Sequence, residues 1–409
     1  MINWEVAEEL LAIYGSPLYV YDAEILRQTI KNITQAIPYP STQFHFASVT
    51  NGNLALLRIF RDAGWGLHAN TPGDVYLGLH AGFEPDRIVY SGSNLNFVEM
   101  EQLLNWGIKT LNLDSLSQLQ LCCQAIDHLQ IPPPLLGLRL NLPEITGNSR
   151  IGVRPQEFPA AIKIADEAGL KISGLHFYRG TGTNATTAFT DAIARILTIA
   201  QQLPDWQYLD FGGGFGYPYH RDRALKDYAT HLSSNGDKAY PAGNRPAFNW
   251  ELFGTQLTQK IEAMEKQINL IIEPGRAAIA GCATLYGRVV SIKWQENKQI
   301  VGVDTTVANL SIPSVHGGYR EIIANTQSAQ KYTSDVCGNT TYSRDYLGKN
   351  CQLPALKIGD TIGILDVGAY GYAMSSHFLH RPKPAEVLLN KSKHRLIRKR
   401  EDYSVLLSD

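Results

Sequence analysis

The feature that most constrains the fold is a regular alternation of short β-rich runs with amphipathic segments between residues 43 and 273. Helical periodicity occurs between the runs, for example in residues 53–63, 115–126 and 188–202. Eight such strands, each followed by a helix, are the content of a (β/α)₈ barrel. The predicted strands are Gln43–Ser48, Gly66–Ala69, Ile88–Tyr90, Thr110–Leu113, Leu136–Leu140, Ile172–Phe177, Tyr208–Phe211 and Leu270–Glu273.

The alternation ends near Ala283, and the rest of the chain is β-rich with frequent turn residues and little helical periodicity. This pattern predicts a separate antiparallel β domain. Within it, the basic run Lys391–Arg400 alternates with apolar residues in the manner of a solvated hairpin. Near the N-terminus, Pro17–Tyr21 reads as a strand, and Asp22 is placed to cap the helix that follows. Residues 218–250 are expected to form a long surface excursion.

Composition narrows the class of protein. At 409 residues, with 44% hydrophobic and 18% charged residues, the chain is expected to form two globular domains. Its net charge of -1 gives no reason to expect nucleic acid or an anionic membrane as a partner. No signal peptide and no apolar run of about 18 residues is visible, so we expect a cytoplasmic protein. The five cysteines have no metal-ligand spacing, and their odd number argues against a disulfide framework.

Two motifs follow predicted barrel strands, where barrel enzymes carry their chemistry. Leu209–Gly216 contains three consecutive glycines, which let backbone N–H groups approach an anion such as phosphate. Ile272–Arg276 supplies a carboxylate, a tight turn and an arginine, which together could hold a protonated ring nitrogen and a phosphate. Each motif alone could serve packing or a surface ion pair, but their occurrence after neighbouring strands favours a binding site.

With these motifs the chain resembles the fold-type III pyridoxal-phosphate (PLP) enzymes, which include diaminopimelate, ornithine and arginine decarboxylases. The matching segments are Gly15–Asp22, Asn112–Ser115, Ser149–Val153, Gly174–His176, Gly212–Gly214, Glu273–Arg276, Gly368–Gly371 and Arg381–Glu386. The resemblance implies an alanine-racemase-like (β/α)₈ barrel over residues 35–282. It also implies an antiparallel β domain made from residues 1–34 and 283–409, which includes the N-terminal strand.

The resemblance also implies roles for the cofactor site. Glu273 would pair with the pyridine nitrogen of PLP, Arg139 would line the site, and Tyr370 would close over the phosphate from the β domain. The residues implied to surround the phosphate are Gly212, Gly213, Gly214, Gly275 and Arg276. The family builds each site from two subunits, so a homodimer is expected.

The reactive part of the pocket departs from the family pattern. Val49 stands where the family has the lysine that forms an imine with PLP, and a valine has no amine with which to do so. The other replacements are His68 for an aspartate, Tyr178 for the histidine that stacks on the ring, Ile312 for an arginine that helps to bind the substrate carboxylate, and Thr341 and Tyr342 in the loop lent by the partner subunit. Asp345 is retained in that loop. A single replacement could be engineered, but a whole set of replacements points to a rebuilt substrate side of the pocket.

Two functions remain open. The first is a PLP-dependent amino-acid decarboxylase-family enzyme for a small amino acid, with PLP bound non-covalently. In that enzyme Tyr178, Thr341 or His316 would handle protons, and Ile312, Tyr342 and Asp345 would face the substrate. The second is a non-catalytic paralogue that binds PLP or another phosphorylated ligand. An unrelated barrel lyase for a sugar phosphate has no specific support. The loop between Asn141 and Ser149 is short for a diaminopimelate decarboxylase, which argues against that substrate.

Overall fold

The computed structural model describes residues 3–147, 149–180, 184–219, 247–316, 318–326 and 328–407. These residues form two compact units. The barrel unit is drawn from Thr29–Tyr217 and Ala247–Ala278, and the β unit from Met1–Gln28 and Ile279–Asp409 together with Pro218 and Tyr219. Most of the predicted excursion at residues 218–250 lies outside the described residues.

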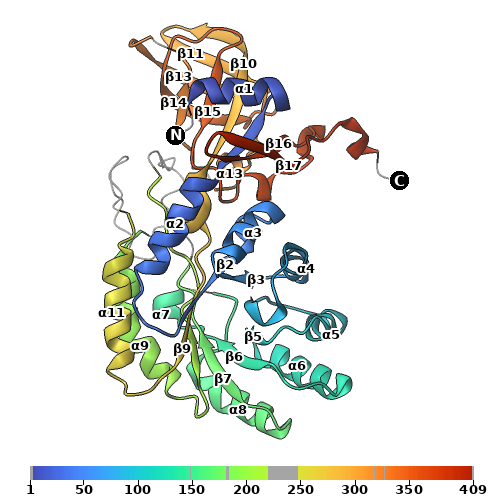
Figure 1. The fold of residues 1–409 in the computed structure, drawn as a ribbon, viewed down its shortest axis with the longest axis vertical. Helices are drawn as coiled ribbons and strands as arrows, with labels where there is room; N and C mark the ends of the chain where they lie inside the picture. The colour runs from blue at the N-terminus through green and yellow to red at the C-terminus, as the bar shows by residue number, and fades with distance from the viewer. Residues whose placement is uncertain are drawn as a thin grey trace. The chain divides into compact units, whose positions relative to one another are not determined.

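The barrel unit contains a closed barrel of eight parallel strands, as predicted (Figure 1). Strand β2 pairs with β3 on one side and with β9 on the other, which closes the ring. The strands are short, apolar and largely buried, as expected where helices cover the outer face and side chains fill the interior. Their bounds are β2 Thr42–Ala47, β3 Gly66–Ala69, β4 Ile88–Tyr90, β5 Thr110–Leu113, β6 Leu135–Arg139, β7 Ile172–His176, β8 Tyr208–Asp210 and β9 Asn269–Ile272.

Several of the helices between these strands begin at capping residues that are visible in the sequence. Asn53 caps α3, and Thr71 and Asn96 form capping boxes with acidic residues three positions later. Ser115 caps α6. The helices around the barrel are α2 Ala23–Gln35, α3 Leu54–Asp62, α4 Pro72–Ala81, α5 Phe97–Asn105, α6 Leu116–Leu129, α7 Pro143–Thr146, α8 Phe158–Glu167, α9 Thr186–Ala200, α11 Trp250–Glu262 and α12 Arg276–Ile279.

The β unit is built on a nine-stranded sheet that includes the N-terminal strand β1, as predicted. Most pairs are antiparallel, but β1 pairs with β16, and β11 with β13, in parallel, so the sheet is mixed. A sequence pattern of half-buried strands does not reveal the direction of each pairing. The elements of the unit are α1 Trp4–Tyr14, β1 Leu18–Asp22, β10 Ala283–Gln295, β11 Lys298–Val303, α13 Ile312–His316, β12 Ile322–Ala324, β13 Lys331–Cys337, β14 Tyr346–Pro354, β15 Thr361–Ile364, β16 Ala385–Asn390 and β17 Lys393–Arg398.

Several smaller predictions are confirmed. Asp22 Oδ1 accepts hydrogen bonds from the backbone N–H groups of Glu24 and Ile25 at 2.9 and 3.1 Å, so it caps α2. The basic run supplies β17, which forms an antiparallel pair with the preceding strand β16. All five cysteines are free thiols. Among the described helices, none combines the length and the hydropathy required to cross a membrane.

Candidate functional site

Val49 lies in a short 3₁₀ turn, Ser48–Thr50, at the carboxyl end of β2. Its side chain is 45% exposed, although Ser48 and Thr50 on either side are buried. The Ser48 hydroxyl donates to the backbone oxygen of His68 and to Asp74 Oδ1, both at 3.0 Å, which fixes the turn against β3. Val49 is therefore presented on a firmly held turn.

This turn packs against the turn that carries Glu273 and Arg276. A side chain at Gly275 would bring its Cβ within 2.7 Å of Thr50 Cγ2 and 3.0 Å of Ala47 Cβ. Ala47 N–H donates to the Pro274 oxygen at 3.4 Å. Gly275 is therefore required for the close approach of these two turns.

Glu273 follows β9 directly and is 2% exposed. Two histidines approach the same carboxylate oxygen: His68 Nε2 and His176 Nε2 each lie 3.5 Å from Glu273 Oε2. Both ring nitrogens of each histidine, and Glu273 Oε1, are buried without a hydrogen-bond partner. Buried polar atoms without partners are costly to leave unsatisfied, so this end of the barrel is suited to a polar ligand.

Burial shifts the protonation equilibria of this group. It lowers the pKa of His176 to about 4 and that of His68 well below its usual value, so both imidazoles are neutral near pH 7. It raises the pKa of Glu273 to about 7, and the pKa of neighbouring Asp210 is also well above its usual range. The site therefore combines two neutral imidazoles with two carboxyl groups that titrate abnormally.

A polar network in the barrel interior holds Asp210. Its Oδ1 accepts from Gly212 N–H at 2.9 Å, and its Oδ2 accepts from Asn112 Nδ2 at 2.8 Å. Asn112 Oδ1 in turn accepts from the Tyr208 hydroxyl at 2.8 Å. This network was missed in the sequence, although Asp210 directly precedes the predicted phosphate turn.

Two glycines provided a possible signal for that network. A Cβ at Gly174 would lie 2.1 Å from the Tyr208 ring, and a Cβ at Gly137 would lie 2.2 Å from the Tyr208 hydroxyl oxygen. Glycine in the middle of two adjacent barrel strands thus makes room for a large side chain inside the barrel.

The glycines of the predicted phosphate turn are also needed for close backbone packing. A Cβ at Gly212 would lie 2.1 Å from the Phe177 oxygen, at Gly213 2.6 Å from the Glu273 oxygen, and at Gly214 2.1 Å from the Gly180 oxygen. Gly212 N–H already donates to Asp210, so this N–H group is engaged within the chain.

Tyr178 and Arg139 form one wall of the site. The Arg139 guanidinium carbon lies 5.2 Å from the centre of the Tyr178 ring, a cation–π contact. The ring also lies beside the glycine turn, 3.5 Å from the position of a Cβ at Gly214. Tyr178 is therefore packed between an arginine and the glycine turn.

The remaining predicted residues belong to the β unit. Ile312 is buried at the start of α13, and His316 is exposed at its end, where its ring lies 6.4 Å from that of Tyr370. Thr341 is exposed, and Tyr342 contacts Phe378 edge-on at 5.4 Å. Asp345 is buried and accepts from Thr306 Oγ1 and Val307 N–H, each at 2.9 Å, and from Thr340 Oγ1, so its carboxylate anchors its own loop.

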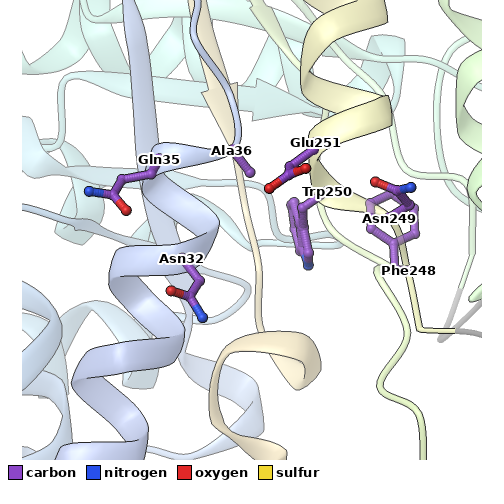
Figure 2. Close-up of a pocket in the computed structure, with 7 residues that line it drawn as sticks. All are labelled: Asn32, Gln35, Ala36, Phe248, Asn249, Trp250 and Glu251. Atoms are coloured by element: carbon purple, nitrogen blue, oxygen red, sulfur yellow. The ribbon is translucent and has the colours of Figure 1, made fainter.

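Two other features of the barrel unit are separate from these predictions. A hollow of about 460 Å³ lies between the end of α2 and the start of α11, and Figure 2 shows Asn32, Gln35, Trp250 and Glu251 around it. No predicted site residue lines it. Ligand atoms of His176, Asp210 and Glu273 lie within 4.8 Å of one another, a grouping that could admit a metal ion although the sequence spacing suggested no metal site.

The chain is similar to known proteins over most of its length. A sequence profile described as the pyridoxal-binding domain of the pyridoxal-dependent decarboxylases matches residues 23–280. The chain belongs to this family of PLP-dependent decarboxylases.

Relatives and solved structures agree with the assignment to the pyridoxal-dependent decarboxylases. The chain is 32% identical to the diaminopimelate decarboxylase of Methanothermobacter thermautotrophicus, over 100% of this chain and 94% of the relative. It is 29% identical to the enzyme of Zymomonas mobilis, over 98% of this chain and 94% of the relative. The structure of Helicobacter pylori diaminopimelate decarboxylase complexed with L-lysine superposes with a TM-score of 0.86 at 27% identity, covering 98% of each chain.

The residues present fit the family's cofactor, PLP. The ring nitrogen of PLP needs a carboxylate, and Glu273 offers one buried oxygen without a partner. The phosphate needs N–H donors and a cation, which the glycine turn and Arg276 supply. These requirements also account for the buried carboxylate without invoking a metal ion.

Proposed function

We propose that this chain binds PLP non-covalently at the carboxyl end of its barrel, and that it acts on, or derives from an enzyme that acted on, a small amino acid. The observation that carries the proposal is the Glu273 carboxylate, which is buried with one oxygen unsatisfied and lies beside the turn on which Val49 replaces the lysine. The curated relatives are diaminopimelate decarboxylases, which supports an amino acid as the substrate.

The chain's own residues would divide the binding as follows. Glu273 would pair with the ring nitrogen, Arg276 and the Gly213–Gly214 turn would hold the phosphate, and Tyr178 with Arg139 would form the wall beside it. Bound PLP supplies an aldehyde that condenses with an amino group and a ring that accepts the electron pair left by departing CO₂. Val49 offers no amine, so the cofactor would be held by its phosphate and its ring nitrogen alone.

Proton handling would fall to groups other than a lysine. Tyr178 is half-buried beside the glycine turn, which makes it the candidate proton carrier within the barrel unit. From the β unit, His316 and Thr341 are the exposed candidates. Ile312, Tyr342 and Asp345 are proposed to shape the substrate side of the pocket, in a homodimer.

A second candidate function is a non-catalytic paralogue that keeps the cofactor site. The observation that favours it is that the Asp345 carboxylate accepts hydrogen bonds from Thr306, Val307 and Thr340 of its own chain. An acid engaged in this way is a loop anchor, and Thr341 beside it is a much weaker acid than the cysteine that the family has there.

The test is the absorbance spectrum of the purified protein with PLP, recorded before and after borohydride, for the natural chain and for Val49→Lys. We expect the natural chain to bind PLP with a shifted spectrum and to release all of it on denaturation after borohydride. Val49→Lys should retain the cofactor covalently, as shown by intact mass. Val98→Lys is the matched control, because it places a lysine at another exposed valine, on α5.

The outcomes separate the candidates. If PLP neither binds nor changes its spectrum, the proposed cofactor site is wrong. If Val49→Lys binds PLP covalently and releases CO₂ from none of diaminopimelate, lysine, ornithine and arginine, the non-catalytic reading replaces the enzymatic one. Release of CO₂ from one of them identifies the substrate class.

A further inference from the structure

His68 is the unusual member of the group around Glu273. It lies on β3, two strands away from β9, and its Nε2 reaches to 3.5 Å from Glu273 Oε2. His176 reaches the same oxygen from β7 at the same distance. The two imidazole rings are 6.5 Å apart between centroids, with 29° between their planes, so the carboxylate oxygen is flanked by two rings.

The arrangement leaves the two oxygens of Glu273 in different surroundings. Oε2 has both histidine Nε2 atoms 3.5 Å away, without a formed hydrogen bond, whereas Oε1 is buried with no hydrogen-bond partner. The other titratable groups that act on the Glu273 carboxyl are Asp210 and Arg139. A neutral imidazole carries one N–H, so each histidine can direct a donor towards Oε2. Donors aimed at an ionised carboxylate stabilise its charge and fix its orientation.

We propose that His68 is a positioning residue for Glu273: together with His176 it holds Oε2 and the negative charge, and it thereby turns Oε1 towards the ring nitrogen of PLP. This inference rests on the proposed function for its ligand, but the part that concerns Glu273 can be tested on the protein without cofactor. The family has an aspartate at this position. An ionised aspartate can only accept hydrogen bonds, whereas a neutral histidine can donate one to Glu273.

The surroundings of His68 support a neutral donor. The other titratable or charged groups that act on it are His176, Arg139 and His45, and none of them carries a negative charge. Burial is the largest influence and keeps the ring uncharged. A neutral histidine can stabilise the Glu273 carboxylate without adding a second buried charge.

The first experiment measures the pKa of Glu273 in the cofactor-free protein by NMR of ¹³C-labelled glutamate, with Glu273→Gln to assign the signal. His68→Phe keeps a ring and removes the donor, and His68→Gln keeps a neutral N–H near the Nε2 position. We expect His68→Phe to raise the pKa of Glu273 by about one unit, because the neutral imidazole dipole that lies 3.5 Å from Oε2 is lost. His68→Gln should leave that pKa close to its value in the natural chain.

The proposal is wrong if Glu273 titrates alike in the natural chain and in His68→Phe, or if His68→Gln shifts it as far as His68→Phe does. If His68→Phe does not fold, His68→Leu takes its place in the comparison. The surface variant His80→Gln, on α4, is the control and should leave the titration unchanged, because the exposed His80 ring hydrogen-bonds to the Tyr76 oxygen of its own helix.

The second experiment compares the binding of PLP with that of its 1-deaza analogue, which has the same phosphate but no ring nitrogen. We expect His68→Phe to weaken PLP binding about tenfold and to leave the analogue unaffected. Equal weakening of both ligands would show a packing effect and overturn the proposal. If the natural chain binds no PLP, the proposed function fails, and the titration of Glu273 alone decides the role of His68.

Discussion

At the scale of single residues, the site is defined by buried groups in unusual protonation states. Val49 carries no amine, and the titratable groups described around it are carboxyls, imidazoles, a tyrosine and arginines. Residue identity was enough to predict that a carboxylate and a glycine turn follow neighbouring barrel strands. It was not enough to predict that His68 and Glu273 meet, because their contact depends on side chains that cross the barrel from strands separated by β2.

Buried histidines also make the stability of the chain depend on pH, and His45 isolates that effect. It is fully buried in β2, its Nδ1 lies 3.3 Å from the Leu67 oxygen, and burial lowers its pKa to about 4. In the unfolded chain this residue becomes protonated below about pH 6.5. In the folded chain it becomes protonated only near pH 4. The neutral His45 therefore contributes to the free energy of unfolding above about pH 6.5, and this contribution is lost as the pH falls towards 4.

Between pH 6.5 and 4.5, the free energy of unfolding of the natural chain should fall because the unfolded chain binds up to about one more proton at His45. We expect His45→Gln to remove this part of the decrease, about 2–3 kcal/mol over the range. Urea unfolding at several pH values measures this slope. His80→Gln on the surface should retain the slope of the natural chain. An unchanged slope in His45→Gln would contradict the expectation, whatever the variant's absolute stability.

At the scale of elements, strands and helices were predictable because each carries its own local signal. The eight barrel strands and the capped helices followed from apolar runs, spacing and capping residues. The parallel pairing of β1 with β16 and of β11 with β13 was not predictable, because the direction of pairing depends on how distant segments meet. The same holds for the attachment of α1 to the sheet of the β unit, which a polar cluster around Glu8 supports.

Glu8 on α1 connects this helix to two strands. Its Oε1 accepts from Thr361 Oγ1 at 2.6 Å, and its Oε2 pairs with Arg288 at 2.6 Å. Asn325 also donates to it, at 3.2 Å. We expect Glu8→Gln to lower the free energy of unfolding of the β unit by about 1–2 kcal/mol, because charge-assisted hydrogen bonds are lost.

Denaturant unfolding monitored by the fluorescence of Trp4, which packs on Tyr286, would measure this change. Glu9→Gln on the same helix is the matched control, since Glu9 is largely exposed and its ion pair with His394 is 3.8 Å long. Equal destabilisation by both variants would show that helix charge, and not the Glu8 cluster, is responsible.

At the scale of the whole molecule, the proposed homodimer remains to be tested. Tyr342 and Phe378 form an edge-on aromatic pair in the β unit, and Phe378 is 53% exposed. Exposed aromatic side chains of this kind are typical of interfaces, and Tyr342 belongs to the loop that the resemblance expects a partner subunit to use.

We expect a native mass of two chains by light scattering, and a shift towards monomer in Phe378→Glu, which places a charge on that aromatic surface. Val98→Glu introduces the same charge at an exposed position on α5 and should leave the mass unchanged. A monomeric natural chain would remove the basis for a shared site.

The position of Tyr208 has a consequence for how such a chain can diverge. The tyrosine and the network of Asn112 and Asp210 occupy the interior below the site, and Gly137 and Gly174 cannot gain even a methyl group without colliding with Tyr208. Val49, by contrast, is 45% exposed at the end of β2 and meets no such constraint. Exposed strand-end positions can therefore change in sequence while the interior of the barrel stays the same.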